Sequence, residues 1–364
     1  GGFLRREGRP GNSAILNARL IDRPIRPLFD KRCRNDIHVM ATVLSVDYDN
    51  APELCGMLGA SASLGISDIP WDGPIAGVRV GCVDGKFVIN PTQEQLKVST
   101  LNITVAGSET AILMVEGGAQ EAPEEDVLDA IMFGHETIKE LVAFQKKIIE
   151  EVGKPKRTLI FPEIPEEIKT AIYAYAERPL KEAIFNPDKL TREAHMEEVR
   201  KEAEAHFKEI YPENGSDIAE CLNHLTKEIV RHMISVDKIR PDGRALDEIR
   251  PISCEVGLLP RVHGSALFTR GQTQALTITT LAPMSETQII DDLTQETEKR
   301  YIHQYNFPSY SVGETKSSRG PGRREIGHGA LAERALIPVI PTVEEFPYAI
   351  RVVSEILESN GSSS

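Results

Sequence analysis

The chain has 364 residues and a formal net charge of −13 at pH 7, with 40% hydrophobic and 27% charged residues. This length allows two or three domains, and the composition is that of a globular protein. Apolar runs are far shorter than the ~20 residues of a transmembrane helix. Five widely spaced cysteines without a Cys-x-x-Cys pair fit neither a zinc site nor a disulfide framework, and favour a reducing, cytoplasmic location.

Charge is unevenly distributed along the chain. Residues 1–35 hold nine Arg and Lys against three Asp and Glu, and residues 316–334 hold five against two, whereas residues 121–237 hold sixteen against twenty-six. The acidic net charge argues against a nucleic-acid partner, but two basic segments are expected if contact with a polyanion is confined to particular loops. Ordinary solvated loops would carry the same charges, so charge alone leaves both interpretations open.

The first third of the chain predicts a mixed α/β domain. β-Branched residues predict a buried strand, small residues a tightly packed helix, and Asp84-Gly85 the type I′ turn of a hairpin. The expected elements are a strand at 36–47, a helix at 52–66, a hairpin at 77–89, and strands at 101–107 and 110–118.

Helical periodicity replaces the strand pattern at residue 122. Apolar residues from Leu128 to Val152 recur on one helical face, Gly153-Lys154-Pro155 ends that helix, and a charged helical stretch continues to about Asp237. Strand patterns return at 249–259, 265–282 and 348–356. The sequence therefore predicts an α/β (α+β) protein, with two mixed-sheet domains and an all-α region between them.

A repeat is visible across these two α/β parts. In the first, Arg5–Glu7 ("RRE") precedes 18–29 ("ARLIDRPIRPLF") and the predicted strand at 36–47. In the second, Arg323–Glu325 ("RRE") precedes 332–341 ("AERALIPVIP") and the strand at 348–356. One folding unit occurring twice explains this order, although chance similarity between short motifs is the alternative.

The last four residues favour an anion site. Gly361 is followed by Ser362, Ser363 and Ser364, and N–H groups after a glycine together with hydroxyls at a helix start can bind phosphate. A plain helix cap uses serine for the same geometric reason. The matching stretch of the first repeat, Asn50–Glu53, contains a proline and a glutamate, which would not suit an anion. This contrast favours a functional interpretation of the serines.

Two glycine-rich segments carry arginines. Arg323 and Arg324 lie in a predicted flexible loop, where guanidinium groups suit phosphate oxygens, and His328 between two glycines could position a phosphate or donate a proton. An Arg–Glu ion pair and a structural histidine are the alternative. Residues 1–10 place an aromatic ring beside paired arginines, the composition of a single-strand platform, although the ring could equally anchor a loop.

An acidic segment gives no convincing metal site. It contains Asp291, Asp292, Glu296 and Glu298 on a predicted helix. A solvated helix face is the more ordinary interpretation of these carboxylates, and no acidic cluster has metal-ligand spacing.

Taken together, the motifs resemble those of the bacterial polynucleotide phosphorylases. The carrying stretches include "GGFLRREGRP", "ARLIDRPIRPLF", "HGSALFTRGQTQAL", "YNFPSYSVGET", "RREIGHG" and "RVVSEILESNGSSS", which recur in order over nearly the whole chain. The resemblance implies two RNase PH-like domains at 1–121 and 238–364, both truncated. A helical region at 122–237 would join them, with its first helix packing on the first domain, and the whole would assemble as a ring-shaped homotrimer.

The activity implied by this resemblance is processive 3′-to-5′ phosphorolysis of single-stranded RNA in mRNA degradation. Inorganic phosphate would release nucleoside diphosphates, and the reaction would run backwards as template-free polymerisation. The implied catalytic residues are Arg323, Arg324 and His328; the phosphate-binding residues are Ser362, Ser363 and Ser364; and the RNA-binding residues are Phe3, Arg5, Arg6, Arg23 and Arg26. Leu4 stands where the family commonly has a second Phe.

The implied cofactor is Mg²⁺ or Mn²⁺, with ligands expected downstream of Ser364, so the segment by itself is expected to be inactive. Its implied partners are single-stranded RNA, phosphate and components of an RNA-degradation complex, with no membrane. A non-catalytic RNA-binding scaffold of the same fold is the alternative. A hydrolytic ribonuclease is disfavoured, because paired arginines and a serine loop suit bound phosphate better than activated water.

Overall fold

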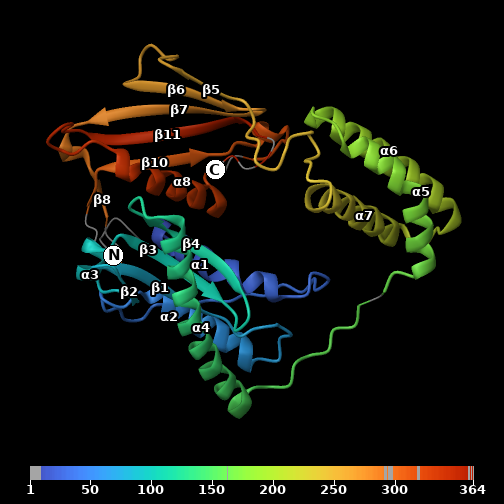
Figure 1. Cartoon of the computed structure of the whole chain (residues 1–364), viewed down its shortest axis with the longest axis horizontal. Coiled ribbons are helices and arrows are strands. Elements are labelled where there is room, and N and C mark those ends of the chain that lie inside the picture. Colours follow the sequence, from blue (N-terminus) through green and yellow to red (C-terminus); the bar gives the residue numbers. More distant parts are fainter. Residues whose placement is uncertain are drawn as a thin grey trace. The chain divides into compact units, whose positions relative to one another are not determined.

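The computed structural model describes residues 10–161, 163–290, 293, 298–317, 320–359, 361 and 363 (Figure 1). Its contacts divide into two units. The first unit comprises Gly1–Leu159, Cys254–Phe268 and Thr273–Ser364, and the helical unit comprises Ile160–Ser253 and Thr269–Gln272. In the described part of the chain, no helix combines the length and apolarity that a membrane span requires.

The first sheet is antiparallel and has the strand order β2-β1-β3-β4. Its strands are β1 (Ala76–Val83), β2 (Lys86–Ile89), β3 (Leu101–Gly107) and β4 (Ile112–Ala119), with the short helix α3 (Gln93–Val98) between β2 and β3. Asp84 and Gly85 have φ angles of 49° and 72°. These positive angles at both central positions confirm the predicted hairpin turn.

Helices cover both faces of this sheet. On one face, α4 (Glu124–Val152) packs against Val78 and Val80, and Gly153 follows its last residue as predicted. On the other, α2 (Pro52–Ile66) approaches so closely that a Cβ at Gly77 would lie 2.6 Å from the Met57 sulfur. Helix α1 (Asn12–Ile25), followed by the 3₁₀ turn η1 (Arg26–Leu28), packs on α2.

The buried strand predicted at 36–47 is wrong. The segment is extended but has no strand assignment, and most of its apolar side chains are exposed, with Met40 at 75% and Leu44 at 92%. β-Branched residues favour an extended backbone, but a strand also needs a neighbour to receive its hydrogen bonds. Among the described residues, no strand is paired with this segment.

The second sheet has the order β10-β11-β7-β6-β5. Its strands are β5 (Ile252–Val256), β6 (Gly264–Arg270), β7 (Thr273–Ala282), β10 (Tyr301–Asn306) and β11 (Ala349–Glu358). The predicted strand regions at 249–259, 265–282 and 348–356 are confirmed, whereas β10 was not predicted. β10 runs parallel to β11, and β11 antiparallel to β7. Helix α8 (Arg323–Leu336) packs on β10, as Figure 1 shows.

Short elements complete this part of the chain. They are η2 (Met284–Glu286), β8 (Gln288–Ile289), β9 (Glu298–Lys299), η3 (Ser309–Val312) and η4 (Ile337–Val339). The helix predicted over the acidic segment is wrong at Glu298, which lies in β9, while Asp291, Asp292 and Glu296 lie outside the described residues.

The repeat extends to the helices but not to the following strand. α1 and α8 are each followed by a 3₁₀ turn, and the two helices contact each other. The second repeat continues into β11, whereas the first continues into the unpaired segment 36–47.

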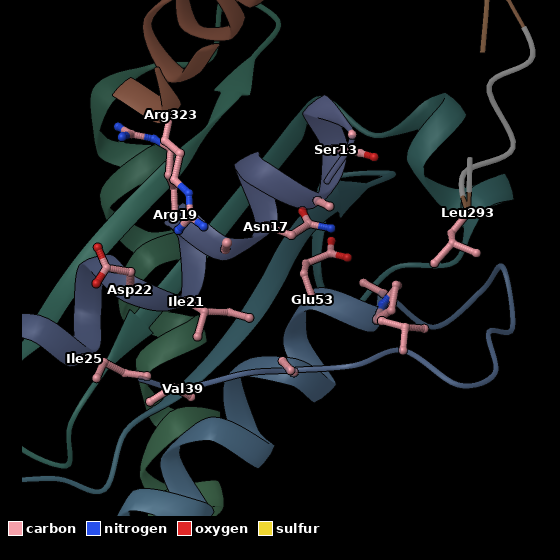
Figure 2. Close-up of a pocket in the computed structure, with 18 of the residues that line it drawn as sticks. Ser13, Asn17, Arg19, Ile21, Asp22, Ile25, Val39, Glu53, Leu293 and Arg323 are labelled. Carbon is pink, nitrogen blue, oxygen red and sulfur yellow. The ribbon is translucent and has the colours of Figure 1, made fainter. Parts of the chain in front are cut away.

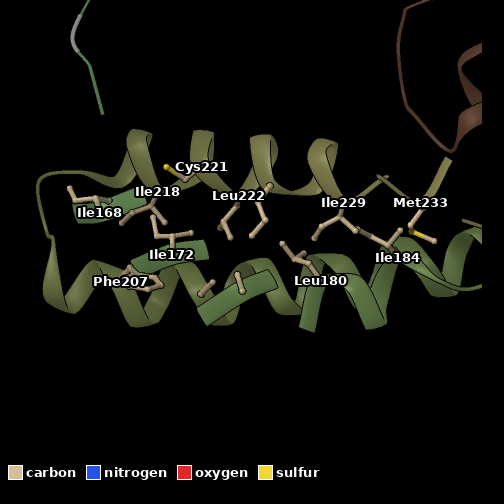
Figure 3. Close-up of a cluster of buried hydrophobic side chains, with 13 residues drawn as sticks. Ile168, Ile172, Leu180, Ile184, Phe207, Ile218, Cys221, Leu222, Ile229 and Met233 are labelled. Carbon is tan, nitrogen blue, oxygen red and sulfur yellow. The ribbon is translucent and has the colours of Figure 1, made fainter. Parts of the chain in front are cut away.

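The helical unit contains α5 (Glu166–Ile184), α6 (Lys189–Ile210) and α7 (Gly215–Ser235). Their apolar faces meet in one core, which includes Ile172, Leu180 and Leu222, each at most 1% exposed (Figure 3). These three helices lie within the predicted helical region 122–237, whose first helix, α4, belongs to the first unit.

Candidate functional site

Arg323 and Arg324 open helix α8. Gly322 precedes the helix, and the Glu325 carboxylate accepts hydrogen bonds from the Gly322 N–H at 2.7 Å and the Phe307 N–H at 2.8 Å. The flexible loop predicted for these arginines is therefore wrong, because a glycine start and a carboxylate cap stabilise a first helical turn. Cations are disfavoured at this positive end of a helix. Neither arginine has an ion pair within the described ranges, so both charges are available to an anion.

His328 lies one turn further along α8. Its ring meets the Tyr305 ring edge-on, with centroids 5.0 Å apart at 75°. Burial, followed by the charges of Arg324 and Arg19, holds the pKa of His328 below its ordinary value, against the opposing effect of Glu325. The imidazole is therefore mostly neutral at pH 7. Its Nδ1 is buried and has no hydrogen-bond partner among the residues that the structure describes.

Ser363 lies next to the same tyrosine. Its Oγ is 2.5 Å from the Tyr305 hydroxyl. The chain reaches it after β11 through Ser359, whose N–H donates to the Ser311 carbonyl at 2.9 Å, and through Gly361, which has a φ of 109°. Ser362 and Ser364 lie outside the described residues, so of the three predicted phosphate-binding serines only Ser363 has a described position.

Arg19 on α1 is part of the site, although the sequence analysis missed it. A Cβ at Gly327 would lie only 2.5 Å from the Arg19 Nε, so the guanidinium group lies directly on the glycine backbone of α8. Figure 2 shows Arg19 and Arg323 extending into the same pocket from the two helices. The available signal was the repeat itself, since Arg19 is the second residue of "ARLIDRPIRPLF".

Arg23 and Arg26 are already ion-paired. Arg23 Nη1 is 2.6 Å from Glu116 Oε2 on β4, and Arg334 of α8 reaches the other oxygen of the same carboxylate at 3.1 Å. Arg26 pairs with Asp22 one turn before it on α1. Phe3, Arg5 and Arg6, the other predicted RNA-binding residues, lie outside the described residues.

A cavity of about 1410 Å³ adjoins these helices. It is lined by α1, by α2, by parts of the extended segment 36–47, and by Arg19, Arg323 and Arg324 (Figure 2). Within it, the Arg79 Nη2 and the Glu53 Oε1 are 2.5 Å apart in an ion pair of low exposure. The positive charge open to a ligand is therefore concentrated at the α1–α8 side of the cavity.

The described residues contain no group of three or more His, Cys, Asp or Glu side chains that could hold a metal ion. Glu298, from the acidic segment, accepts a hydrogen bond from the Thr287 hydroxyl at 3.0 Å. The described part of the site is thus a basic cluster with a neutral histidine and a serine hydroxyl, which is suited to binding a phosphate group.

Family models match most of the chain. The model described as "3' exoribonuclease family, domain 1" matches residues 1–70 and 248–364. The model for domain 2 of the same family matches residues 73–137. Residues 167–245 match "Polyribonucleotide nucleotidyltransferase, RNA binding domain".

Curated relatives agree with these models. The chain is 59% identical over 364 residues to a polyribonucleotide nucleotidyltransferase of Heliobacterium modesticaldum, and 60% identical over 364 residues to one of Syntrophomonas wolfei. These matches include the whole chain but 51% and 52% of the relatives, so the chain spans about half their length. A solved structure, an archaeoglobus fulgidus exosome with RNA bound to the active site, is 17% identical, with a TM-score of 0.28 over 37% of this chain and 54% of that chain.

Proposed function

We propose that this chain, which belongs to the 3′ exoribonuclease family, acts in the phosphorolysis of single-stranded RNA. The full reaction would be processive, would proceed from the 3′ end, and would release nucleoside diphosphates during mRNA degradation. It would run backwards as template-free polymerisation. The observation that carries the proposal is the group of three arginines without ion pairs among the described residues, Arg19, Arg323 and Arg324, beside a neutral histidine.

Arg323 and Arg324 would bind inorganic phosphate together with the serine loop. Guanidinium groups stay charged at any working pH and offer paired donors that match phosphate oxygens. Phosphate would attack the last phosphodiester, the bond from phosphorus to the 3′ oxygen of the preceding nucleotide would break, and that oxygen would receive a proton. Because charge builds up on the phosphoryl oxygens, fixed positive charge and correct positioning would supply most of the catalysis.

His328 would hold the phosphate rather than protonate the leaving group. A histidine whose pKa lies below the ordinary value is mostly neutral at pH 7, so only a small fraction is the imidazolium that could donate a proton to the leaving group. A neutral imidazole can accept a hydrogen bond from a protonated phosphate oxygen. We therefore assign His328 to phosphate binding in preference to proton donation.

Arg23 and Arg26 would contact the RNA backbone, with Phe3, Arg5 and Arg6 gripping the strand ahead of the site. In the free protein, carboxylates already neutralise Arg23 and Arg26, so RNA would have to compete for them. Binding should then weaken with salt, with a log–log slope of about −0.7 for each phosphate neutralised on a single strand.

Mg²⁺ or Mn²⁺ is the proposed cofactor. The residues described here do not provide a fitting ligand set, so no step is assigned to the metal. We also propose that the protein forms a homotrimer, joins an RNA-degradation complex and works in the cytoplasm. Its domain boundaries would lie at residues 121 and 237.

The test is ADP release from poly(A) in the presence of phosphate and Mg²⁺. Arg324→Ala and the matched control Arg261→Ala, which removes an exposed arginine outside the basic cluster, would be made in a chain extended to the length of the curated relatives. The 364-residue chain would be measured beside it. The expected result is phosphate-dependent ADP release by the extended chain and none by the 364-residue chain, with the release lost in Arg324→Ala and kept in Arg261→Ala.

The other outcomes identify other functions. RNA binding by the extended chain without ADP release at any phosphate concentration would favour the non-catalytic scaffold. Release of AMP without added phosphate would favour a hydrolytic ribonuclease and overturn the proposed reaction.

A further inference from the structure

Tyr305 lies between the two parts of the candidate site. Its hydroxyl is 2.5 Å from Ser363 Oγ, and its ring meets His328 edge-on. The residue is only 5% exposed, so few water molecules can reach its hydroxyl and compete with Ser363 for the hydrogen bond. One side chain therefore touches both the serine loop and the histidine of α8.

The tyrosine is held on several sides. It lies on β10 opposite Ser354 of β11, and its ring stacks on Phe307 at 7° with centroids 6.4 Å apart. Helix α8 approaches closely, since a Cβ at Gly329 would lie 3.6 Å from the Tyr305 Cβ. A ring held by a strand, a helix and another ring presents its hydroxyl at a fixed point.

The phenol also stays protonated. Burial raises the pKa of Tyr305 above its ordinary value, although the Ser363 hydrogen bond and the Arg324 charge act against burial. Both hydroxyls therefore keep a hydrogen at neutral pH, and either can donate to the other. Because a free serine hydroxyl rotates between rotamers, this bond limits Ser363 to orientations that also satisfy Tyr305.

We infer that Tyr305 is a positioning residue that fixes the Ser363 hydroxyl and the His328 ring for phosphate binding, without touching the substrate itself. This inference rests on the proposed function, because it assumes that the serine loop and α8 bind phosphate. The contacts involve the serine loop and α8, and none involves Arg23 or Arg26. Loss of the hydroxyl should therefore affect phosphate binding and leave RNA binding nearly unchanged.

The experiment uses Tyr305→Phe in the whole chain. Isothermal titration calorimetry would measure inorganic phosphate binding, and fluorescence anisotropy would measure a labelled oligo(A) without phosphate. Loss of one hydrogen bond predicts phosphate binding weaker by about three- to tenfold, with RNA affinity changed less than about twofold. Tyr301→Phe is the matched control: Tyr301 lies on the same strand, and its hydroxyl bonds His303 Nδ1 at 2.9 Å instead of the serine loop.

A double-mutant cycle separates positioning from general destabilisation. If Tyr305 acts through Ser363, Tyr305→Phe will add little to Ser363→Ala, because the partner is already gone. Unchanged phosphate affinity in Tyr305→Phe, or fully additive losses in the double variant, would overturn the inference while leaving the proposed phosphate site intact. If the unsubstituted chain bound oligo(A) but no phosphate, the phosphate site itself would be refuted, and this inference with it.

Discussion

Glu116→Gln should destabilise the first unit by about 1 kcal/mol. The carboxylate on β4 joins Arg23 of α1 at 2.6 Å and Arg334 of α8 at 3.1 Å. The side chains are 44% and 38% exposed for the arginines and 31% for the glutamate, so solvent screens both pairs in part. Exposed pairs contribute about 0.2–1 kcal/mol each. Glutamine keeps one acceptor oxygen, so one arginine can keep a hydrogen bond, while the other arginine faces an amide NH2 group that cannot accept one.

Urea unfolding followed by tryptophan fluorescence would measure this loss. Trp71 is the single tryptophan of the chain, lies 6.3 Å from the Phe29 ring, and donates from Nε1 to the Ile25 carbonyl at 3.1 Å. It therefore reports unfolding of the first unit. The loss should shrink at 1 M salt, because the Debye length falls from about 8 Å at 0.15 M to about 3 Å.

Glu136→Gln is the control for this prediction. Glu136 pairs with Lys139 at i,i+3 within α4, and the side chains are 66% and 40% exposed, so its removal should destabilise the unit less than removal of Glu116 does. Equal losses in the two variants, or a Glu116→Gln loss that is the same at high salt, would show that the bridge does not hold α1, β4 and α8 together.

Three further predictions concern stability and binding. Burial lowers the pKa of His303 below its ordinary value of 6.5, so below pH 6.5 the unfolded chain binds a proton more readily than the folded chain does. The free energy of unfolding should therefore decrease as the pH falls from 6.5, and it should decrease less steeply in His303→Gln. Urea midpoints measured across this pH range would test this. Gly327→Ala should displace the Arg19 guanidinium and weaken oligo(A) or phosphate binding severalfold in titrations, with the secondary structure kept by circular dichroism. Lys156→Gln should cost about 1 kcal/mol in urea unfolding, because the ammonium group donates to three carbonyls at the end of α2, each at 2.8 Å.

Local patterns predicted most of the elements. The Asp84-Gly85 turn, the long apolar face ended by Gly153 and the alternating strands of the second sheet each depend on residues close together in the chain. Backbone preference and side-chain periodicity are properties of such short segments. These predictions therefore did not need knowledge of the tertiary packing.

Two of the three wrong predictions, the strand at 36–47 and the loop at Arg323, depend on contacts with distant segments. Whether 36–47 forms a strand depends on a neighbouring strand, which its own sequence does not specify. The glycines around Arg323 suggested a loop, but the Glu325 carboxylate also reaches the Phe307 N–H on a different segment and stabilises the helix start. Glycine content measures flexibility of the isolated chain and omits such a contact.

Arg19 and Tyr305 show the same limit for the site. The role of Arg19 follows from its contact with Gly327, which requires α1 and α8 to pack together; in the sequence, only the repeat pointed to this arginine. The proposed role of Tyr305 follows from its hydrogen bond to Ser363, which lies 58 residues further along the chain, and from its ring contact with His328. Residue types and spacing predicted Arg323, Arg324, His328 and the serines as candidates, because glycine-flanked arginines and consecutive hydroxyls suit a phosphate group.

The three arginines of the first repeat, Arg19, Arg23 and Arg26, differ in how available their charges are to an anionic ligand. On α1, Asp22 and Glu116 neutralise Arg26 and Arg23, whereas Arg19 has no ion pair among the described residues and lies against the glycine backbone of α8. An anion at the α1–α8 contact would therefore meet charges that no internal carboxylate offsets, and one further along α1 would have to displace a carboxylate first. Since displacement weakens net attraction, phosphate should bind more strongly beside Arg19 than beside Arg23 or Arg26, which separates a tight site from a weaker path along the same helix.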